Sequence, residues 1–228
     1  MSHELRTPLT SVMGFIDLAM DGAGDPVGEK TVKLLGTARS NAERLQRLVD
    51  DILDISRMES DALGLEMDSV NVVELAQDLA DGVNALFVER DIKLMVDVDE
   101  EVPMIWADRG RMGQIIINLL TNARDASPPG ASIRIEGAPI DEQRAHIRVI
   151  DQGSGIDQNL IEQIFEPFFT TKEPGKGTGL GLALVYRIID DLGGDISVES
   201  PVDAGPHPGS CFHIHLPLAC QIGTGQQH

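Results

Sequence analysis

The sequence is poor in cysteine, in positive charge and in long apolar stretches. Two of its 228 residues are cysteines, Cys211 and Cys220, which are too few for a disulfide framework and lack the spacing of metal ligands. Lys and Arg number 18 against 37 Asp and Glu, and the resulting charge of −19 argues against a general affinity for nucleic acids or anionic membranes. No apolar run approaches a membrane span, and the N-terminus does not resemble a signal peptide. We therefore expect a soluble, acidic, intracellular protein.

The rest of the composition is that of a folded protein. Hydrophobic residues make up 42% of the chain, and its 23 glycines and 12 prolines are dispersed, so neither disorder nor a collagen-like repeat is expected. The length suffices for one large domain or two modest ones, each with its own core. Composition alone says nothing more about function.

The first quarter of the sequence predicts a helical hairpin. Apolar residues recur at spacings of three and four between Leu5 and Ala19, which places them on one stripe of a helix. The stretch from Asp21 to Pro26 ends that helix, and a second, heptad-like apolar pattern runs over residues 34–55. One hairpin cannot cover both stripes. We therefore expect two copies to form a four-helix bundle, in preference to a hairpin that packs on the rest of its own chain.

A hinge is expected at residues 61–68, where the helical periodicity ends. Beyond it, the patterns predict helices at 73–88, 111–126 and 180–192, and strands at 92–98, 104–106, 132–135, 146–150, 195–199 and 211–216. This order favours an α/β sandwich, a mixed sheet with helices on one face. The predicted fold class is therefore α+β, with the helical hairpin first and the sandwich after it.

The first pattern with chemical meaning is the pair His3–Glu4. A carboxylate on one ring nitrogen of a neutral imidazole fixes its tautomer and raises the basicity of the other nitrogen, which makes a nucleophile. Pro8 removes a backbone donor, so the helix is expected to bend beside His3. Taken alone, such a pair is more simply explained as a solvated surface pair.

Two further patterns carry polar groups that suit a nucleotide. Asn118 and Asn122 are four residues apart and share a helix face, and amide oxygens are acceptable Mg²⁺ ligands where phosphates supply the negative charge. Asp151 directly follows an apolar strand and precedes Gly153 and Gly155, an arrangement that suits a purine whose amino group donates to a carboxylate. Taken alone, capping asparagines and a tight glycine turn are the simpler explanations.

The fourth pattern is a glycine-rich stretch that opens a predicted helix. Residues 175–181 read Gly-Lys-Gly-Thr-Gly-Leu-Gly. Successive exposed amides at a helix N-terminus bind phosphate, and Lys172 and Lys176 add positive charge. The spacing fits neither a Walker loop nor a Rossmann fingerprint. The preceding residues 164–172, which begin with an aromatic segment at 164–169, predict a mobile lid.

In this order the patterns resemble the sensor histidine kinases of two-component signalling. The matching stretches are a phosphoacceptor box at His3, an N box at 118–122, glycine boxes at 151–155 and 177–181, and an aromatic lid motif at 165–169. The resemblance extends from residue 2 to about residue 218. It implies a dimerisation and histidine phosphotransfer hairpin at residues 1–66, followed at residues 67–228 by a catalytic ATP-binding domain of the type shared with gyrases and Hsp90-like chaperones.

The resemblance implies a role for each matching residue. His3 attacks the γ-phosphate of ATP, Glu4 orients and activates its imidazole, and Thr7 holds the water that dephosphorylates a partner. Asn122 is the Mg²⁺ ligand and Asn118 assists it. An amide at 118, where gyrase-like ATPases carry a glutamate, disfavours hydrolysis. The residues implied in binding the nucleotide are Asn118, Asn122, Asp151, Gly153, Gly155, Phe165, Lys176, Gly177, Thr178, Gly179, Leu180 and Gly181.

The sequence departs from the family pattern in two places. Many members carry a tyrosine-arginine pair in the lid motif, with the arginine near the γ-phosphate, whereas this sequence has Phe169-Thr170. We expect Lys172 to supply that charge instead. The first helix of the family also normally begins several residues before the phosphoacceptor box. We therefore expect an upstream sensor or membrane segment, and a cytoplasmic location for the part in hand.

The resemblance also implies partners. These are a second copy of the chain and the receiver domain of a response regulator, whose aspartate accepts the phosphoryl group and which docks around Val12, Met13 and Ile16; no nucleic acid is expected. Two other functions stay open. A hydrolytic ATPase or chaperone-like clamp is opposed by Asn118 and by His3. A non-enzymatic phosphotransfer or scaffold dimer is opposed by the intact glycine boxes.

The remaining histidines have a simpler explanation. His213 and His215 alternate with apolar residues and are expected on the outer face of a strand. His146 and His207 belong to no group of candidate catalytic or metal-binding residues.

Overall fold

A computed structural model describes residues 2–20, 28, 29, 31–39, 42, 45, 49, 64–99, 102–139, 143–173 and 177–219. In the first helix, side chains are described at residue 10 and from residue 12 onward. The chain divides into two compact units, Met1–Leu63 and Gly64–His228. Among the described helices, none combines the length and the apolar character that a membrane span requires.

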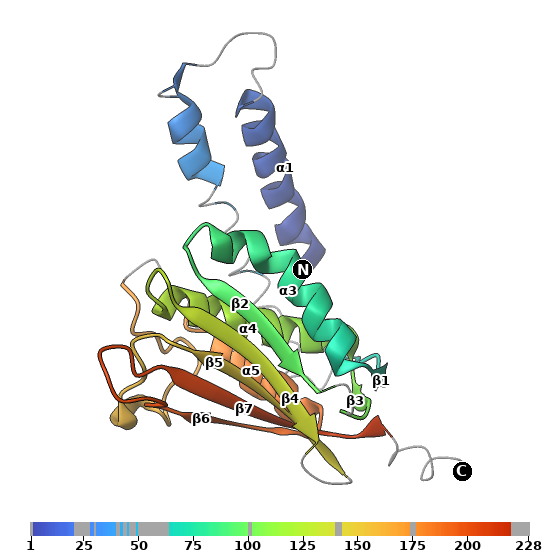
Figure 1. Cartoon of the computed structure of the whole chain (residues 1–228). Helices are drawn as coiled ribbons and strands as arrows, with labels where there is room; N and C mark the ends of the chain where they lie inside the picture. The colour runs from blue at the N-terminus through green and yellow to red at the C-terminus, as the bar shows by residue number, and fades with distance from the viewer. Residues whose placement is uncertain are drawn as a thin grey trace, which may run out of the picture. The chain divides into compact units, whose positions relative to one another are not determined.

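The first unit contains the first predicted helix and a helical segment at the start of the second. α1 covers Ser2–Met20 and continues through Pro8, and residues 31–39 form a second helical segment beside it (Figure 1). An ion pair joins the two, because Arg39 Nη1 lies 2.9 Å from Asp17 Oδ1. The later part of the predicted second helix lies largely outside the described residues. Several large apolar side chains of this unit remain exposed, among them Val12, Phe15, Leu18 and Leu34.

The second unit is built on a five-stranded mixed sheet. Its elements are β1 (Asp68–Val70), α3 (Val72–Val88), β2 (Lys93–Val98), β3 (Ile105–Ala107), α4 (Arg109–Ala126), β4 (Ser132–Pro139), β5 (Arg144–Asp151), the 3₁₀ turn η1 (Gln158–Leu160), α5 (Gly181–Asp191), β6 (Asp195–Glu199) and β7 (Ser210–Pro217). The strand order is β2-β4-β5-β7-β6. β2 pairs with β4 in parallel and every other pair in this sheet is antiparallel. The predicted α+β class and mixed sheet are confirmed.

The core lies between this sheet and its helices. Along β5 the burial alternates, with Ala145, Ile147 and Val149 turned inward, as expected for a strand with one covered face. α4 buries Ile115, Ile116, Leu119 and Leu120, and α3, α4 and α5 all contact the sheet (Figure 1). The alternating apolar residues of the strands and the apolar stripes of the helices thus form one core.

Most of the predicted boundaries shift by one or two residues, and three of the differences have a clear structural reason. α4 begins two residues early because the Asp108 side chain accepts a hydrogen bond from Arg111 N at 3.0 Å and caps the helix. β4 continues past residue 135 to Pro139 because its residues from Arg134 to Pro139 all pair with β5. The hinge expected at 61–68 is wrong at its end, since Asp68 begins β1 and pairs with Ala107 of β3; residues 61–63 lie outside the described part.

The outer face of the sheet carries a group of histidines. His213 and His215 lie there on β7, as predicted, while Phe212 and Ile214 point into the core. The expectation that His146 stands alone is wrong, because its Nε2 lies 3.0 Å from His213 Nδ1 and its ring is 4.6 Å from that of His215. Burial and the neighbouring His215 and His213 lower the pKa of His146 to about 4.

Candidate functional site

Helix α4 presents its two asparagines beside the start of α5. Asn118 and Asn122 are half-buried at the edge of the core face of the helix. The Nδ2 of Asn118 donates to Gln114 O at 3.1 Å, so the side chain is held by its amino end. A Cβ at Gly181 would stand 3.1 Å from Asn118 Oδ1. The amide oxygen of Asn118 therefore faces the first residue of α5.

The end of β5 holds Asp151 in a buried position. Asp151 is 5% exposed, and its Oδ1 accepts hydrogen bonds from Gly153 N at 2.7 Å and from Ser210 N at 3.3 Å. Burial raises the pKa of this carboxyl, although the two backbone hydrogen bonds act in the opposite direction. Both described hydrogen bonds go to Oδ1, so Oδ2 is the oxygen that could accept a hydrogen bond from a ligand.

The glycine turn after Asp151 packs on the end of α4. A Cβ at Gly153 would lie 2.8 Å from Ala126 Cβ and 2.9 Å from Ala126 O, so no larger residue fits there without movement. Ser154 N donates to Ala126 O at 3.3 Å. The turn thus places Asp151 next to the helix that bears the asparagines.

Two serines that the sequence patterns did not indicate fix this turn. Ser200 is buried, and its Oγ accepts from Ile156 N at 2.8 Å and donates to Gly209 O at 2.9 Å. Ser210 supplies the second backbone donor to Asp151. Ser200 and Ile156 are 44 residues apart, so no local spacing could have revealed this contact.

The second glycine loop interlocks with the aromatic segment. Phe168 N donates to Gly179 O at 2.9 Å, and a Cβ at Gly179 would stand 2.7 Å from Phe168 O. Both residues have positive φ, 69° at Gly179 and 68° at Phe168. A bulky residue with such a φ is strained, and Phe168 is also 69% exposed. Phe165 of the same segment packs at 5.7 Å between ring centroids against Tyr186.

The start of α5 lacks a side-chain cap. Its N-cap residue, Leu180, is buried and offers no side-chain hydrogen bond to the first turn. Leu180 N itself donates to Thr178 Oγ1 at 3.2 Å. Since the first amides of a helix need acceptors and carry its positive dipole end, phosphate oxygens can satisfy them.

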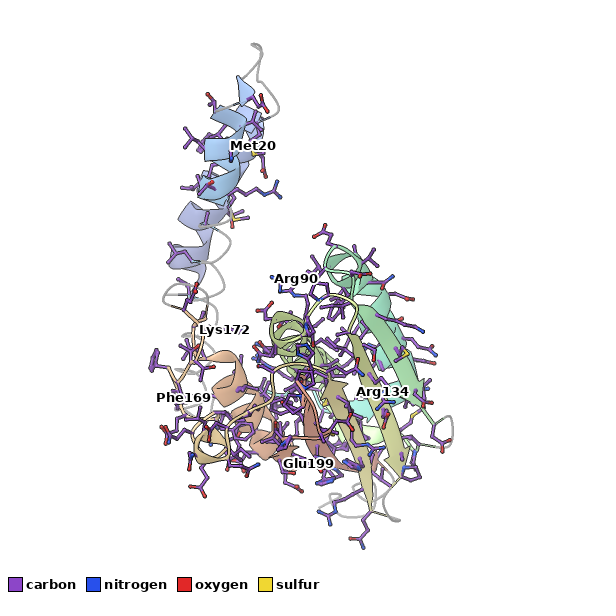
Figure 2. All side chains as sticks on the ribbon, turned by 60° about the vertical axis from the view of Figure 1, so that its left-hand side comes forward. Met20, Arg90, Arg134, Phe169, Lys172 and Glu199 are labelled. Carbon is purple, nitrogen blue, oxygen red and sulfur yellow. The ribbon has the colours of Figure 1, made fainter. Side chains whose placement is uncertain are left out.

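Lys172, which is labelled in Figure 2, follows the aromatic segment, and its side chain reaches Asp125 of α4. Its Nζ lies 2.8 Å from Asp125 Oδ2 and 3.4 Å from Asn122 Oδ1. Burial acts to raise the pKa of Asp125, but Lys172 and Arg124 outweigh it, so this pKa lies below its ordinary value. Asp125 was missed by sequence reasoning, although its position three residues after Asn122 puts it on the same face of the helix.

The structure brings together, within the second unit, the asparagines, Asp151, the glycines of both boxes and Lys172. The side chains of His3, Glu4 and Thr7, and all of Lys176, lie outside the described residues. Within the described part of the chain, no three His, Cys, Asp or Glu side chains are placed to hold a metal ion. The amide oxygen of Asn122 is of a type that can ligate a hard cation such as Mg²⁺.

Two protein-family models match the chain. The His Kinase A (phospho-acceptor) domain matches residues 1–61, and the histidine kinase-, DNA gyrase B- and HSP90-like ATPase matches residues 107–219. Both matches agree with the two-part organisation of the fold.

Two curated proteins that are similar to the chain are sensory kinases by name. The sensor kinase CckA of Brucella abortus is 35% identical over 95% of this chain and 23% of its own length. The adaptive-response sensory kinase SasA of Crocosphaera subtropica is 33% identical over 96% of this chain and 58% of its own length. The chain thus spans less than two thirds of these relatives.

Two solved structures extend the comparison. Full-length ShkA, in complex with AMPPNP, is 29% identical and has a TM-score of 0.78 over 95% of this chain and 44% of that one. The catalytic domain of histidine kinase ThkA is 32% identical, with a TM-score of 0.59 over 67% of this chain and 96% of that one.

Proposed function

Because the chain belongs to the histidine kinases of two-component signalling, we propose that it is an ATP-dependent protein-histidine kinase. It phosphorylates itself on His3 and passes the phosphoryl group to an aspartate of a response-regulator receiver domain. The observation that supports this most is that the Asp151 turn and the uncapped start of α5 both lie against α4, the helix that carries Asn118 and Asn122.

The adenine of ATP is read by Asp151. Its Oδ2 accepts a hydrogen bond from the purine amino group, while Gly153 and Gly155 allow the ring to approach the backbone. The triphosphate lies along residues 177–181, where the amides at the start of α5 bind its oxygens; Thr178, Leu180, Lys176 and Phe165 belong to the same nucleotide site.

Asn122 ligates Mg²⁺ through its amide oxygen, and Asn118 assists. The bound ion supplies charge neutralisation on the phosphates. Lys172 reaches the terminal phosphate from the aromatic segment and offsets the charge of the group being transferred. Catalysis in this domain is therefore positioning and electrostatics, with an amide at residue 118 that cannot activate water for hydrolysis.

The first unit supplies the acceptor of the phosphoryl group. The neutral imidazole of His3 attacks the γ-phosphorus as the bond to the leaving ADP breaks, and Glu4 orients the ring. Thr7, one helical turn further, positions a water that dephosphorylates the regulator. We place the boundary between this hairpin and the catalytic domain at residues 66 and 67, close to the division of the compact units at 63 and 64.

The partners follow from the exposed apolar side chains of the first unit. Phe15 is 71% and Leu34 is 65% exposed in the single chain, which is explained if a second copy covers them in a four-helix bundle. The receiver domain docks around Val12, Met13 and Ile16.

The test is to incubate the chain with γ-labelled ATP and Mg²⁺ and to measure acid-labile label on the protein and free phosphate. Label that is lost in His3→Gln and in Asn122→Asp, but kept in the matched control His207→Gln, supports the kinase. Free phosphate without labelled protein indicates the hydrolytic ATPase. Absence of both indicates a scaffold. Lys172→Ala is expected to lower the phosphorylation rate more than ATP affinity, and equal losses contradict its role.

A further inference from the structure

Asp125 is a carboxylate surrounded by cations at the end of α4. Its Oδ2 is 2.8 Å from Lys172 Nζ, and its Oδ1 is 2.8 Å from Arg124 Nη2 and 3.7 Å from Arg90 Nη1. Asp125 shares a helix face with Asn122. Its ion pair with Lys172 therefore holds Lys172 at the face of α4 that would bind Mg²⁺ and phosphate.

The position of Lys172 conflicts with a cation on Asn122. The ammonium lies 3.4 Å from Asn122 Oδ1, and Mg²⁺ binds an oxygen at about 2.1 Å. Two positive charges that share one oxygen at such distances repel each other strongly. Binding of the Mg²⁺-nucleotide therefore displaces the ammonium from Asn122, and Asp125 and the triphosphate then compete for it.

Resting on the proposed function, we infer that Asp125 is a positioning residue that holds Lys172 on α4 before nucleotide binding and yields it to the terminal phosphate afterward. The exchange breaks an ion pair whose side chains are only 34% and 27% exposed. Because this ion pair has to break, the affinity for the nucleotide is lower than the phosphate-binding groups alone would give. The same ion pair keeps Lys172 close to the place of the terminal phosphate.

The test is a double-mutant cycle on the full chain, with the dissociation constant of Mg²⁺-ATP measured by equilibrium titration. Asp125→Asn keeps the size of the side chain and removes its charge. We expect it to tighten ATP binding by about two- to fivefold, the size that ion pairs at partly exposed positions give. In the Lys172→Met background, most of this gain disappears.

A matched control is Glu136→Gln. Glu136 likewise lies between two arginines, 3.4 Å from Arg134 Nε and 2.6 Å from Arg148 Nη2, but on the outer face of the sheet. Its loss of charge is expected to leave ATP affinity unchanged. Asp125→Ser repeats the cycle if the asparagine variant does not fold.

Three results would overturn the inference. An equal gain with and without Lys172 means that Asp125 acts only as a repulsive charge. Unchanged or weaker ATP binding in both Asp125 variants means that it is only structural. If the rate of autophosphorylation at saturating ATP changes while the KM for ATP does not, Asp125 acts in the transfer step. Failure of the proposed function is distinguishable, because then the unmodified chain binds no ATP or carries no label on His3.

Discussion

The contact between Gly179 and Phe168 leads to the sharpest prediction, because α5 offers a matched control at its other end. Gly179 precedes α5 with φ 69°, and Gly193 follows it with φ 73°. An alanine at either position adopts a left-handed backbone at a cost of about 1 kcal/mol in the free energy of unfolding. At Gly193 a Cβ meets no atom within 4 Å, so this cost is the whole expected effect.

At Gly179 the cost is larger. The new Cβ would lie 2.7 Å from Phe168 O and 2.8 Å from Phe168 Cα, whereas non-bonded carbons prefer about 3.5–4.0 Å. The backbone of Phe168 therefore retreats by roughly 1 Å, and its 2.9 Å hydrogen bond to Gly179 O is lost, which adds about 1 kcal/mol. The total is about 2 kcal/mol for Gly179→Ala against about 1 kcal/mol for Gly193→Ala.

Both quantities can be measured on the same samples. Urea unfolding followed by the fluorescence of Trp106, the single tryptophan, gives the free energies, and titration with ATP gives the affinities. Gly179→Ala is expected to lose about fivefold in ATP affinity, because about 1 kcal/mol goes into reshaping the loop that is proposed to hold the phosphates. Equal stability losses in the two variants, with ATP affinity intact in both, would refute the reasoning.

The remaining predictions concern a histidine, the adenine site and the core. The folded-state pKa of His146, about 4, lies below its ordinary value of 6.5, so the unfolded chain binds the proton first and stability is lost as the pH falls from 6.5 toward 4. Discounted for partial exposure, the extra loss between pH 7 and 5 is about 1 kcal/mol; it should be absent in His146→Gln, and parallel urea curves would contradict it. Asp151→Asn keeps an oxygen for the two backbone donors but turns an N–H toward the purine; competition binding should show ATP affinity falling by about tenfold or more relative to GTP, and an unchanged ratio would be evidence against the adenine assignment. Leu119→Ala removes a side chain with 0% exposure and should cost about 2–5 kcal/mol in urea unfolding; less than 1 kcal/mol would mean that α4 is not packed as described.

Elements with strong local signals were predictable from the sequence. The strand Asp195–Glu199 has the predicted bounds, because glycines precede it and Ser200-Pro201 follows it. The end of β4 was not predictable. Gly137 breaks the apolar pattern, but a Cβ there would meet Val98 of β2 at 2.9 Å, so the glycine is required by a neighbouring strand. Such a requirement leaves no trace in local sequence.

The same distinction applies to the candidate site. The asparagines on α4 and the two glycine boxes could be found because their chemistry depends on short spacings. Ser210 bonds to Asp151 from 59 residues away, and Lys172 reaches Asp125 across 47. These contacts exist only once β7 pairs with β5 and the aromatic segment folds onto α4, so the fold has to be known first.

The central place of β5 in the sheet has a consequence for motion. β5 pairs with β4 on one side and β7 on the other, so its amide hydrogens should exchange with solvent only when the whole domain opens. Asp151 ends that strand, whereas residues 177–180 form a turn that regular strand pairing does not tie down. If Asp151 binds the base and residues 177–180 bind the triphosphate, as proposed, the base site lies on the most rigid part of the domain, and we expect most of the entropy cost of ordering on ATP binding to fall on residues 177–180.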